Sequence, residues 1–159
     1  MPSIQKVAVI GSGVMGSGIA AQAANAGLEV ILLDIVAEGS DRDAVARDAI
    51  QRMRKTNPAP LMHPRNAARI QPGNLDDHLD WLADCDLVIE AVLENLEIKK
   101  DLYQKVNAHR RSDCIVTSNT STIPLDHLVA DMSEDFREYF AVTHFFNPPR
   151  YMRLLELVA

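Results

Sequence analysis

The sequence predicts an α/β protein with a doubly wound, mostly parallel sheet and helices on both of its faces. Five short runs are apolar on successive residues: 7–10, 30–33, 87–89, 115–116 and 140–142. Such runs are typical of strands that are covered on both faces. Segments with helical character lie between them, at 15–26, 41–55, 95–108 and 125–129. This alternation, with short connections, favours a doubly wound parallel sheet.

The remaining segments are less regular. The alanine-rich helix over 15–26 is expected to stop at Gly27, which suits a helix C-terminus. Segment 56–66 holds three prolines and cannot be a regular helix throughout. We expect an irregular excursion there, followed by a short strand near Ile70. Residues 154–158 are expected to form a last strand.

Composition limits the function classes. The 159 residues are 47% hydrophobic and 24% charged, which indicates one globular domain. A net charge of −6 argues against general nucleic-acid binding. No apolar stretch approaches the roughly 18 residues of a membrane helix, and the N-terminus lacks the apolar region of a signal peptide. We therefore expect a cytoplasmic protein that binds neither nucleic acid nor membrane.

The side chains that often bind metals show no metal-ligand spacing, so no metal site is predicted. Cys85 and Cys114 adjoin apolar runs, which favours buried thiols in a reducing compartment. Four histidines without a catalytic context are expected at the surface: His63, His78, His109 and His127.

Charge is unevenly distributed along the chain. Between residues 41 and 69, seven Arg and Lys residues stand against three Asp residues, a local charge of +4 that leaves −10 on the remainder. A basic segment on an acidic protein can receive a phosphorylated ligand. A solvated helix face explains the same pattern, and the sequence does not decide between the two.

A glycine loop follows the first predicted strand. The segment GSGVMG places glycines at Gly11, Gly13 and Gly16, and it opens a predicted helix. In this context Gly11 permits a tight turn, Gly13 lets the backbone approach a pyrophosphate, and Gly16 lets the helix pack against the sheet. The free N–H groups at the start of the helix, near Val14 and Met15, then bind phosphate oxygens. The loop therefore predicts a Rossmann-type dinucleotide site.

An acidic residue completes this fingerprint. Asp34 ends the second predicted strand, 18 residues after Gly16. Its carboxylate can accept hydrogen bonds from the hydroxyls of the adenosine ribose. The same charge would repel a 2′-phosphate, so the predicted cofactor is NAD and not NADP.

Three further stretches carry a family resemblance: EAVLENLEIK at 90–99, SNTS at 118–121 and HFFNPP at 144–149. Together with the glycine loop, they resemble in order and spacing the 3-hydroxyacyl-CoA dehydrogenases of fatty-acid β-oxidation. Segment 147–152 looks more like the long multifunctional members that also carry an enoyl-CoA hydratase. The proline-rich stretch at 56–66 departs from many relatives, which have a helical hairpin there that helps to hold CoA.

The resemblance implies roles at the matched positions. His144 would be the general base, Glu156 its orienting carboxylate, and Ser121 a hydrogen-bond partner of the substrate oxygen. Asn119 would lie beside the nicotinamide, and Asn147 would help to hold the active-site loop.

Glu94 and Lys99 would contact the ribose on the nicotinamide side of NAD, again by resemblance. Residues 1–159 would form the NAD-binding domain. The helical C-terminal domain of the parent protein, which supplies a further asparagine and most of the contact between subunits, would be absent. We therefore expect an acyl-CoA substrate, a homo-oligomeric parent, and little or no activity from this chain alone.

Elementary chemistry agrees with these roles. Oxidation of a secondary alcohol requires removal of the hydroxyl proton, and histidine is a suitable base near neutral pH. A carboxylate on the other ring nitrogen fixes the tautomer and stabilises the imidazolium. A carboxylate such as Glu156 in an apolar strand needs a partner, and His144 provides one.

Two alternatives stay open at this point. The chain could belong to another NAD-linked hydroxyacid dehydrogenase with a similar glycine loop, although such enzymes usually rely on a catalytic lysine in a later domain. It could also be a non-catalytic NAD-binding protein on the same fold. The joint presence of Ser121, His144 and Glu156 favours a 3-hydroxyacyl-CoA dehydrogenase over both of these alternatives.

Overall fold

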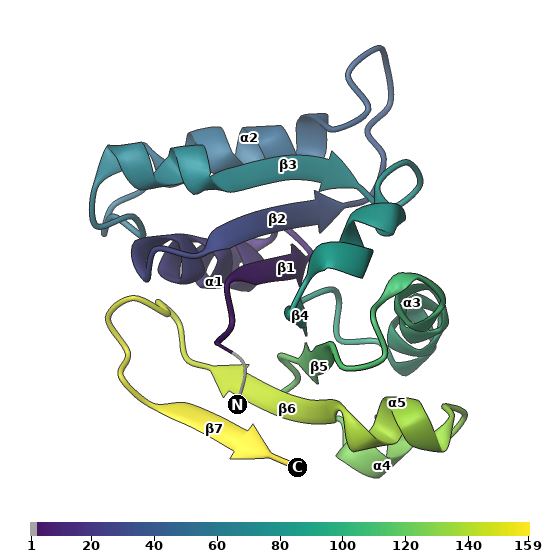
Figure 1. Cartoon of the computed structure of the whole chain (residues 1–159). Coiled ribbons are helices and arrows are strands. Elements are labelled where there is room, and N and C mark those ends of the chain that lie inside the picture. Colours follow the sequence, from purple (N-terminus) through teal and green to yellow (C-terminus); the bar gives the residue numbers. More distant parts are fainter. Residues whose placement is uncertain (1–2) are drawn as a thin grey trace.

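A seven-stranded sheet lies between two layers of helices in the computed structural model, which describes residues 3–159 (Figure 1). Its strands are β1 (Lys6–Ile10), β2 (Glu29–Asp34), β3 (Ile70–Asn74), β4 (Leu87–Glu90), β5 (Ile115–Ser118), β6 (Phe140–Phe145) and β7 (Leu155–Val158). The order across the sheet is β3-β2-β1-β4-β5-β6-β7. All neighbours are parallel except β6 and β7, which are antiparallel. The predicted fold class is therefore confirmed.

The helices cover both faces of the sheet. They are α1 (Val14–Asn25), α2 (Ala44–Met53), α3 (Leu96–His109), α4 (Leu125–Leu128) and α5 (Glu134–Glu138), with 3-10 turns at η1 (Pro64–Arg69) and η2 (Leu79–Asp84). Successive β1 residues pack on opposite layers. Val7 and Val9 join the core under α1 and α2, whereas Ala8 and Ile10 join the core under α3, α4 and α5. Burial on both faces explains why the strands are apolar without alternation.

The structure extends the predicted elements in a few places. The short strand near Ile70 runs on through Pro72 to Asn74, which an edge strand tolerates because one of its sides needs no N–H donors. The short α5 and the η2 turn carry too few periodic residues to be predicted. Both cysteines are buried, as expected.

Two findings concern features that bind metals or membranes. Among residues 3–159, no helix combines the length and apolar character needed to cross a membrane. The same residues contain no group of three or more His, Cys, Asp or Glu side chains that could hold a metal ion.

The topology opens a crevice at one edge of the sheet. The chain leaves β1 toward β2 and leaves β4 toward β5, so the loops after these adjacent strands diverge. Ligands of doubly wound proteins bind at such a switch point, beyond the carboxyl ends of the strands. The glycine loop follows β1, and the loop 91–95 follows β4, so both border this crevice.

The three glycines of the loop motif have different steric surroundings. Gly11 has a φ of +99°, a conformation that favours glycine. A Cβ at Gly16 would lie 1.8 Å from the carbonyl oxygen of Gly11, so only glycine permits this approach of α1 to the turn. A Cβ at Gly13 would meet no atom within 4 Å.

Gly16→Ala is therefore expected to destabilise the domain by roughly 3 kcal/mol, the upper end of the cost of overpacking. Gly13→Ala is the matched control. It should leave the stability unchanged or raise it by about 0.5 kcal/mol, because its backbone conformation suits alanine. Urea unfolding of the two variants measures the difference, and equal stabilities would contradict the steric argument.

Candidate active site

A cavity of about 890 Å³ lies at the carboxyl edge of the sheet. It is lined by the loops after β1, β2, β4 and β5 and by the end of β6. Ten of the predicted site residues line it: Gly11, Gly13, Val14, Met15, Asp34, Glu94, Asn119, Ser121, His144 and Asn147. Three predicted site residues do not line the cavity, namely Gly16, Lys99 and Glu156, and their positions are described below.

The phosphate end of the cavity is formed by the start of α1. Among the described residues, no side chain caps this helix, whose N-cap is Gly13. Its first N–H groups therefore remain available to an anion. Gly16 stands behind Gly11, where it sets the distance between helix and turn without reaching the cavity.

Asp34 connects the glycine loop to the end of β2. Its Oδ2 accepts hydrogen bonds from the Ser12 backbone N–H at 2.5 Å and from the Ser12 hydroxyl at 2.6 Å, and its Oδ1 accepts from the Ile35 N–H at 2.7 Å. The carboxylate thus has a fixed orientation at the cavity wall. Ser12 was not predicted as part of the site; its position inside the glycine motif is the signal that could have found it.

His144 and Glu156 form a hydrogen-bonded pair. They lie directly opposite each other in the antiparallel ladder of β6 and β7. His144 Nδ1 is 2.8 Å from Glu156 Oε2, and this nitrogen must carry the proton because a carboxylate only accepts. The Nε2 of the ring is then left as an acceptor, which is the arrangement that a general base requires.

The premise that Glu156 is a buried carboxylate was wrong. Its side chain is 55% exposed, whereas that of His144 is 24% exposed. β7 is the last strand of the sheet, and all four of its residues are exposed. An edge strand can carry a charged side chain without the desolvation that the apolar pattern of the segment implied.

Glu94 accepts four hydrogen bonds in the cavity wall. Its Oε1 accepts from the hydroxyl of Thr120, from the hydroxyl of Thr122 at 3.0 Å, and from the backbone N–H of Ser121 at 3.3 Å. Burial opposes the charge, but these hydrogen bonds and the ammonium of Lys99 lower the pKa of Glu94 to about 2. Glu94 therefore remains a carboxylate at every physiological pH.

The structure does not support a direct contact between Lys99 and the cofactor. Lys99 is fully buried, with its Nζ 2.6 Å from Glu90 Oε1 and 3.4 Å from Glu94 Oε2. The ammonium thus lies beneath the cavity wall, and any effect on a ligand passes through Glu94. Motif matching places residues in a site without showing which of them face the ligand.

Glu90 was missed as a functional residue. It is 1% exposed, and its carboxylate accepts from Lys99, from the Tyr103 hydroxyl at 2.7 Å and from the Ser118 hydroxyl at 2.7 Å. A buried carboxylate of this kind always needs partners. The signal was present, because Glu90 follows three apolar residues of a strand that is covered on both faces.

Asn119 and Ser121 extend this network to the cavity. The N–H of Asn119 donates to the Glu90 carbonyl at 2.7 Å, and its side-chain oxygen accepts from the Phe145 N–H at 2.9 Å. Asn119 therefore ties the end of β5 to β6, next to His144. Ser121 is exposed in the cavity wall with its backbone held by Glu94.

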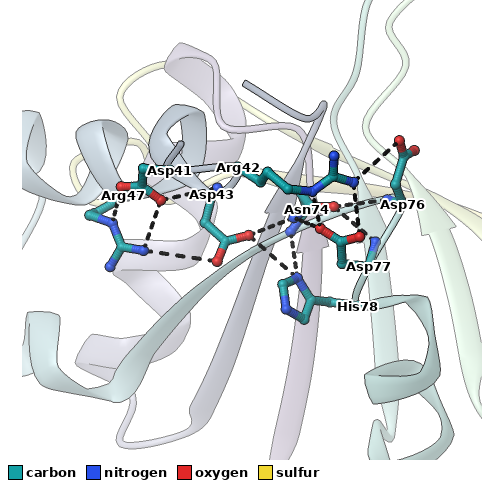
Figure 2. Close-up of polar contacts among 8 residues, drawn as sticks. All are labelled: Asp41, Arg42, Asp43, Arg47, Asn74, Asp76, Asp77 and His78. Carbon is teal, nitrogen blue, oxygen red and sulfur yellow. Dashed lines mark hydrogen bonds and ion pairs between the residues drawn. The ribbon is translucent and has the colours of Figure 1, made fainter. Parts of the chain in front are cut away.

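Two of the seven cations of the basic segment are paired with nearby aspartates (Figure 2). Arg42 donates to both carboxylate oxygens of Asp77, at 2.6 and 2.9 Å, and Arg47 donates to Asp41 at 2.9 Å. The solvated-face interpretation therefore holds for the first half of the segment. Further along the segment, Arg52 and Arg54 are exposed.

His78 is not the surface residue that was expected. Its ring lies 3.9 Å from that of Trp81, centroid to centroid, and its Nδ1 accepts the backbone N–H of Asn74 at 3.1 Å. Asp43 Oδ1 lies 3.4 Å from the same nitrogen. His78 thus helps to order the end of β3 (Figure 2).

A second cavity, of about 540 Å³, adjoins the first. The two share Ser12, Gly13, Val14 and Asn147 in their walls. The second cavity is also lined by Arg52 of α2 and by Pro58 and Pro60 of the proline-rich loop. The departure from the family pattern at 56–66 therefore borders a cavity next to the site.

Comparison with known proteins agrees with this geometry. Residues 6–159 match the family model of the 3-hydroxyacyl-CoA dehydrogenase NAD binding domain. The chain is 49% identical to a putative fatty acid oxidation complex trifunctional enzyme of Rickettsia felis and 45% identical to a probable 3-hydroxyacyl-CoA dehydrogenase of Bacillus subtilis. In both comparisons, 98% of this chain covers 22% of the relative.

A solved structure is also similar. The 3-hydroxybutyryl-CoA dehydrogenase of Escherichia coli K12 superimposes with a TM-score of 0.82 at 35% identity, over 99% of this chain and 33% of that one. The chain thus spans a third or less of the length of these three relatives. By its sequence and its fold, the chain belongs to the 3-hydroxyacyl-CoA dehydrogenase family, and it corresponds to the NAD-binding domain of that family.

Proposed function

We propose that the protein containing this domain oxidises 3-hydroxyacyl-CoA to 3-oxoacyl-CoA with NAD, as part of fatty-acid β-oxidation. The observation that carries the proposal is the His144–Glu156 pair, with His144 in the wall of the cavity that the glycine loop and Asp34 also line. A non-catalytic NAD-binding protein would have no use for a base oriented in this way.

The donors and acceptors of the cavity fit NAD. The uncapped start of α1 suits a pyrophosphate, and the open space at Gly13 lets it approach the backbone. Asp34 offers acceptor positions to the adenosine ribose. When bound, NAD supplies the acceptor for the hydride that leaves the substrate carbon.

The residues of this chain account for the proton. Nε2 of His144 accepts the proton of the substrate hydroxyl while the carbon–oxygen double bond forms. Glu156 holds the Nδ1 proton and stabilises the positive charge that develops on the ring. Ser121, exposed at the same wall, donates to the substrate oxygen.

The CoA arm of the substrate is proposed to run through the second cavity. A thioester placed at His144 has to leave the first cavity past Asn147, which lines both. The guanidinium of Arg52, which lines the second cavity, can pair with a phosphate of CoA. The acyl chain is left on the side that this domain does not enclose.

Glu94 is proposed to accept a hydrogen bond from the ribose on the nicotinamide side. Its Oε1 is occupied by the 120–122 loop, whereas its Oε2 faces Lys99 at the longer distance of 3.4 Å. The second oxygen therefore keeps acceptor capacity. The low pKa ensures that this acceptor is charged.

Asp34 should make this chain select NADH over NADPH, and Asp34→Ala should narrow the difference, because repulsion of the 2′-phosphate is removed. Calorimetric titration of both cofactors measures it. Ser12→Ala is the matched control, since it removes a hydrogen bond to Asp34 but keeps the charge, and it should preserve the preference. Equal affinity of the unmodified chain for both cofactors would refute the role of Asp34.

In the full-length dehydrogenase, His144→Gln should lower turnover by about 10²–10⁴-fold and leave the dissociation constant of NADH unchanged, because the base takes no part in binding the cofactor. Glu156→Gln should also lower turnover strongly, and the double variant should lose far less than the product of the two losses. His127→Gln, at an exposed position of α4, is the control. Full activity of Glu156→Gln would make Glu156 a structural residue.

The depressed pKa of Glu94 predicts a pH-dependent contribution to stability. A carboxyl group with a lowered folded-state pKa stabilises the protein above its unfolded value, here 4.5, and this contribution is lost as pH falls toward about 2. The free energy of unfolding of the wild type should therefore exceed that of Glu94→Gln by a constant amount from pH 7 to 5, and this difference should shrink below pH 4.5. Urea unfolding at several pH values measures it. Glu97→Gln, also exposed, is the control, and an advantage that does not change with pH would contradict the prediction.

A further inference from the structure

The connection between β6 and β7 is fastened to the proline-rich loop. Arg150 Nη1 donates to the carbonyl of Ala59 at 2.7 Å and to that of Leu61 at 3.0 Å. The hydroxyl of Tyr151 donates to the same Ala59 carbonyl at 3.0 Å, and the Arg150 guanidinium lies over the Tyr151 ring at 5.1 Å. These contacts join segments that are about ninety residues apart in the chain.

The loop is held from its other side by Asn25, the last residue of α1. Asn25 Nδ2 donates to the Pro60 carbonyl at 2.9 Å, and its Oδ1 accepts from the Met62 N–H at 2.8 Å. A segment with so many prolines cannot satisfy its backbone groups within a helix or a sheet. Side chains from α1 and from the β6–β7 connection supply the missing partners instead.

The same contacts shape the second cavity. Pro58 and Pro60 line it together with Pro149 and Arg150. Pro149 lies so close to α1 that a Cβ at Gly18 would be 2.8 Å from its Cδ. The cavity is thus bounded by the two segments that Arg150 joins, and one of them leads directly from the strand of His144 to the strand of Glu156.

We propose that Arg150 is a positioning residue that holds the proline-rich loop against the β6–β7 connection and so sets the second cavity for the CoA arm of the substrate. This inference rests on the proposed function. Arg150 acts through the loop, since its Nη1 is engaged by two backbone carbonyls.

The test compares two thioesters in the full-length dehydrogenase. Acetoacetyl-CoA carries the whole CoA arm, whereas the N-acetylcysteamine thioester of acetoacetate lacks the nucleotide and most of the arm. Arg150→Gln should raise KM for acetoacetyl-CoA about tenfold, the value of one to two lost hydrogen bonds from a charged donor. The kcat/KM for the short thioester and the KM for NADH should not change.

Three further variants separate positioning from direct contact. Tyr151→Phe and Asn25→Ala loosen the same loop without removing a charge, so both should raise the KM for acetoacetyl-CoA in the same direction. Arg153→Gln removes a positive charge from the same connection, at an exposed position, and should have no effect. A rise in KM confined to Arg150→Gln would show that Arg150 binds the ligand directly and would overturn the proposal.

Hydrogen exchange gives a readout that does not depend on activity. In this chain, Arg150→Gln should speed amide exchange within residues 57–62, and Arg153→Gln should not. Unchanged exchange would overturn the proposal, and so would an equal loss of activity on both thioesters. A wild-type enzyme inactive on both thioesters would refute the proposed function instead, and the exchange rates would then decide on the contact alone.

Discussion

The carboxylate of Glu90 is buried at the carboxyl end of β4, and the hydrogen bonds that it accepts offset the cost of burying its charge. Its donors come from α3, from β5 and from the backbone after β4. A buried charge without partners costs several kcal/mol, so these elements are held at fixed positions around it. The cavity wall rests on this arrangement, because Lys99 connects Glu90 to Glu94, and Glu94 in turn holds the 120–122 loop.

The His144–Glu156 pair is held in a different way. His144 and Glu156 meet across the last two strands, where the antiparallel register alone places them opposite each other. Their hydrogen bond needs no buried network, since β7 is exposed and Glu156 is more than half accessible. A buried support beneath the cavity wall at Glu94 thus lies beside a more open edge of the sheet at His144.

The exposed arginines before and at the start of α2 form ion pairs with aspartates nearby. Arg47 is paired with Asp41 of its own segment, and Arg42 is paired with Asp77 after β3, so both order the approach to α2 (Figure 2). Exposed pairs of this kind contribute little to stability, so their effect is mainly to fix the loop. They also remove two cations from the surface that a phosphorylated ligand could use. A cation that such a ligand could still use, Arg52, lines the second cavity.

The sequence by itself determined the parallel sheet, the glycine loop, Asp34 and the pairing partner of His144. The sheet and the glycine loop follow from local rules, namely apolar runs that mark covered strands and glycines that a turn requires. The pairing of His144 with Glu156 was implied by the family resemblance of the motifs. Motif matching also predicted ten of the residues that line the cavity.

Only the tertiary structure decided which of these side chains face the cavity. Lys99 and Glu94 belong to one motif, yet one is fully buried and the other lines the wall, because the start of α3 turns Lys99 toward Glu90. Nor could the sequence show that Arg150 meets the carbonyl of Ala59, since nothing local links residues 91 positions apart. Contacts of this kind depend on how the chain packs, and a proline-rich loop has no periodicity from which its partners can be predicted.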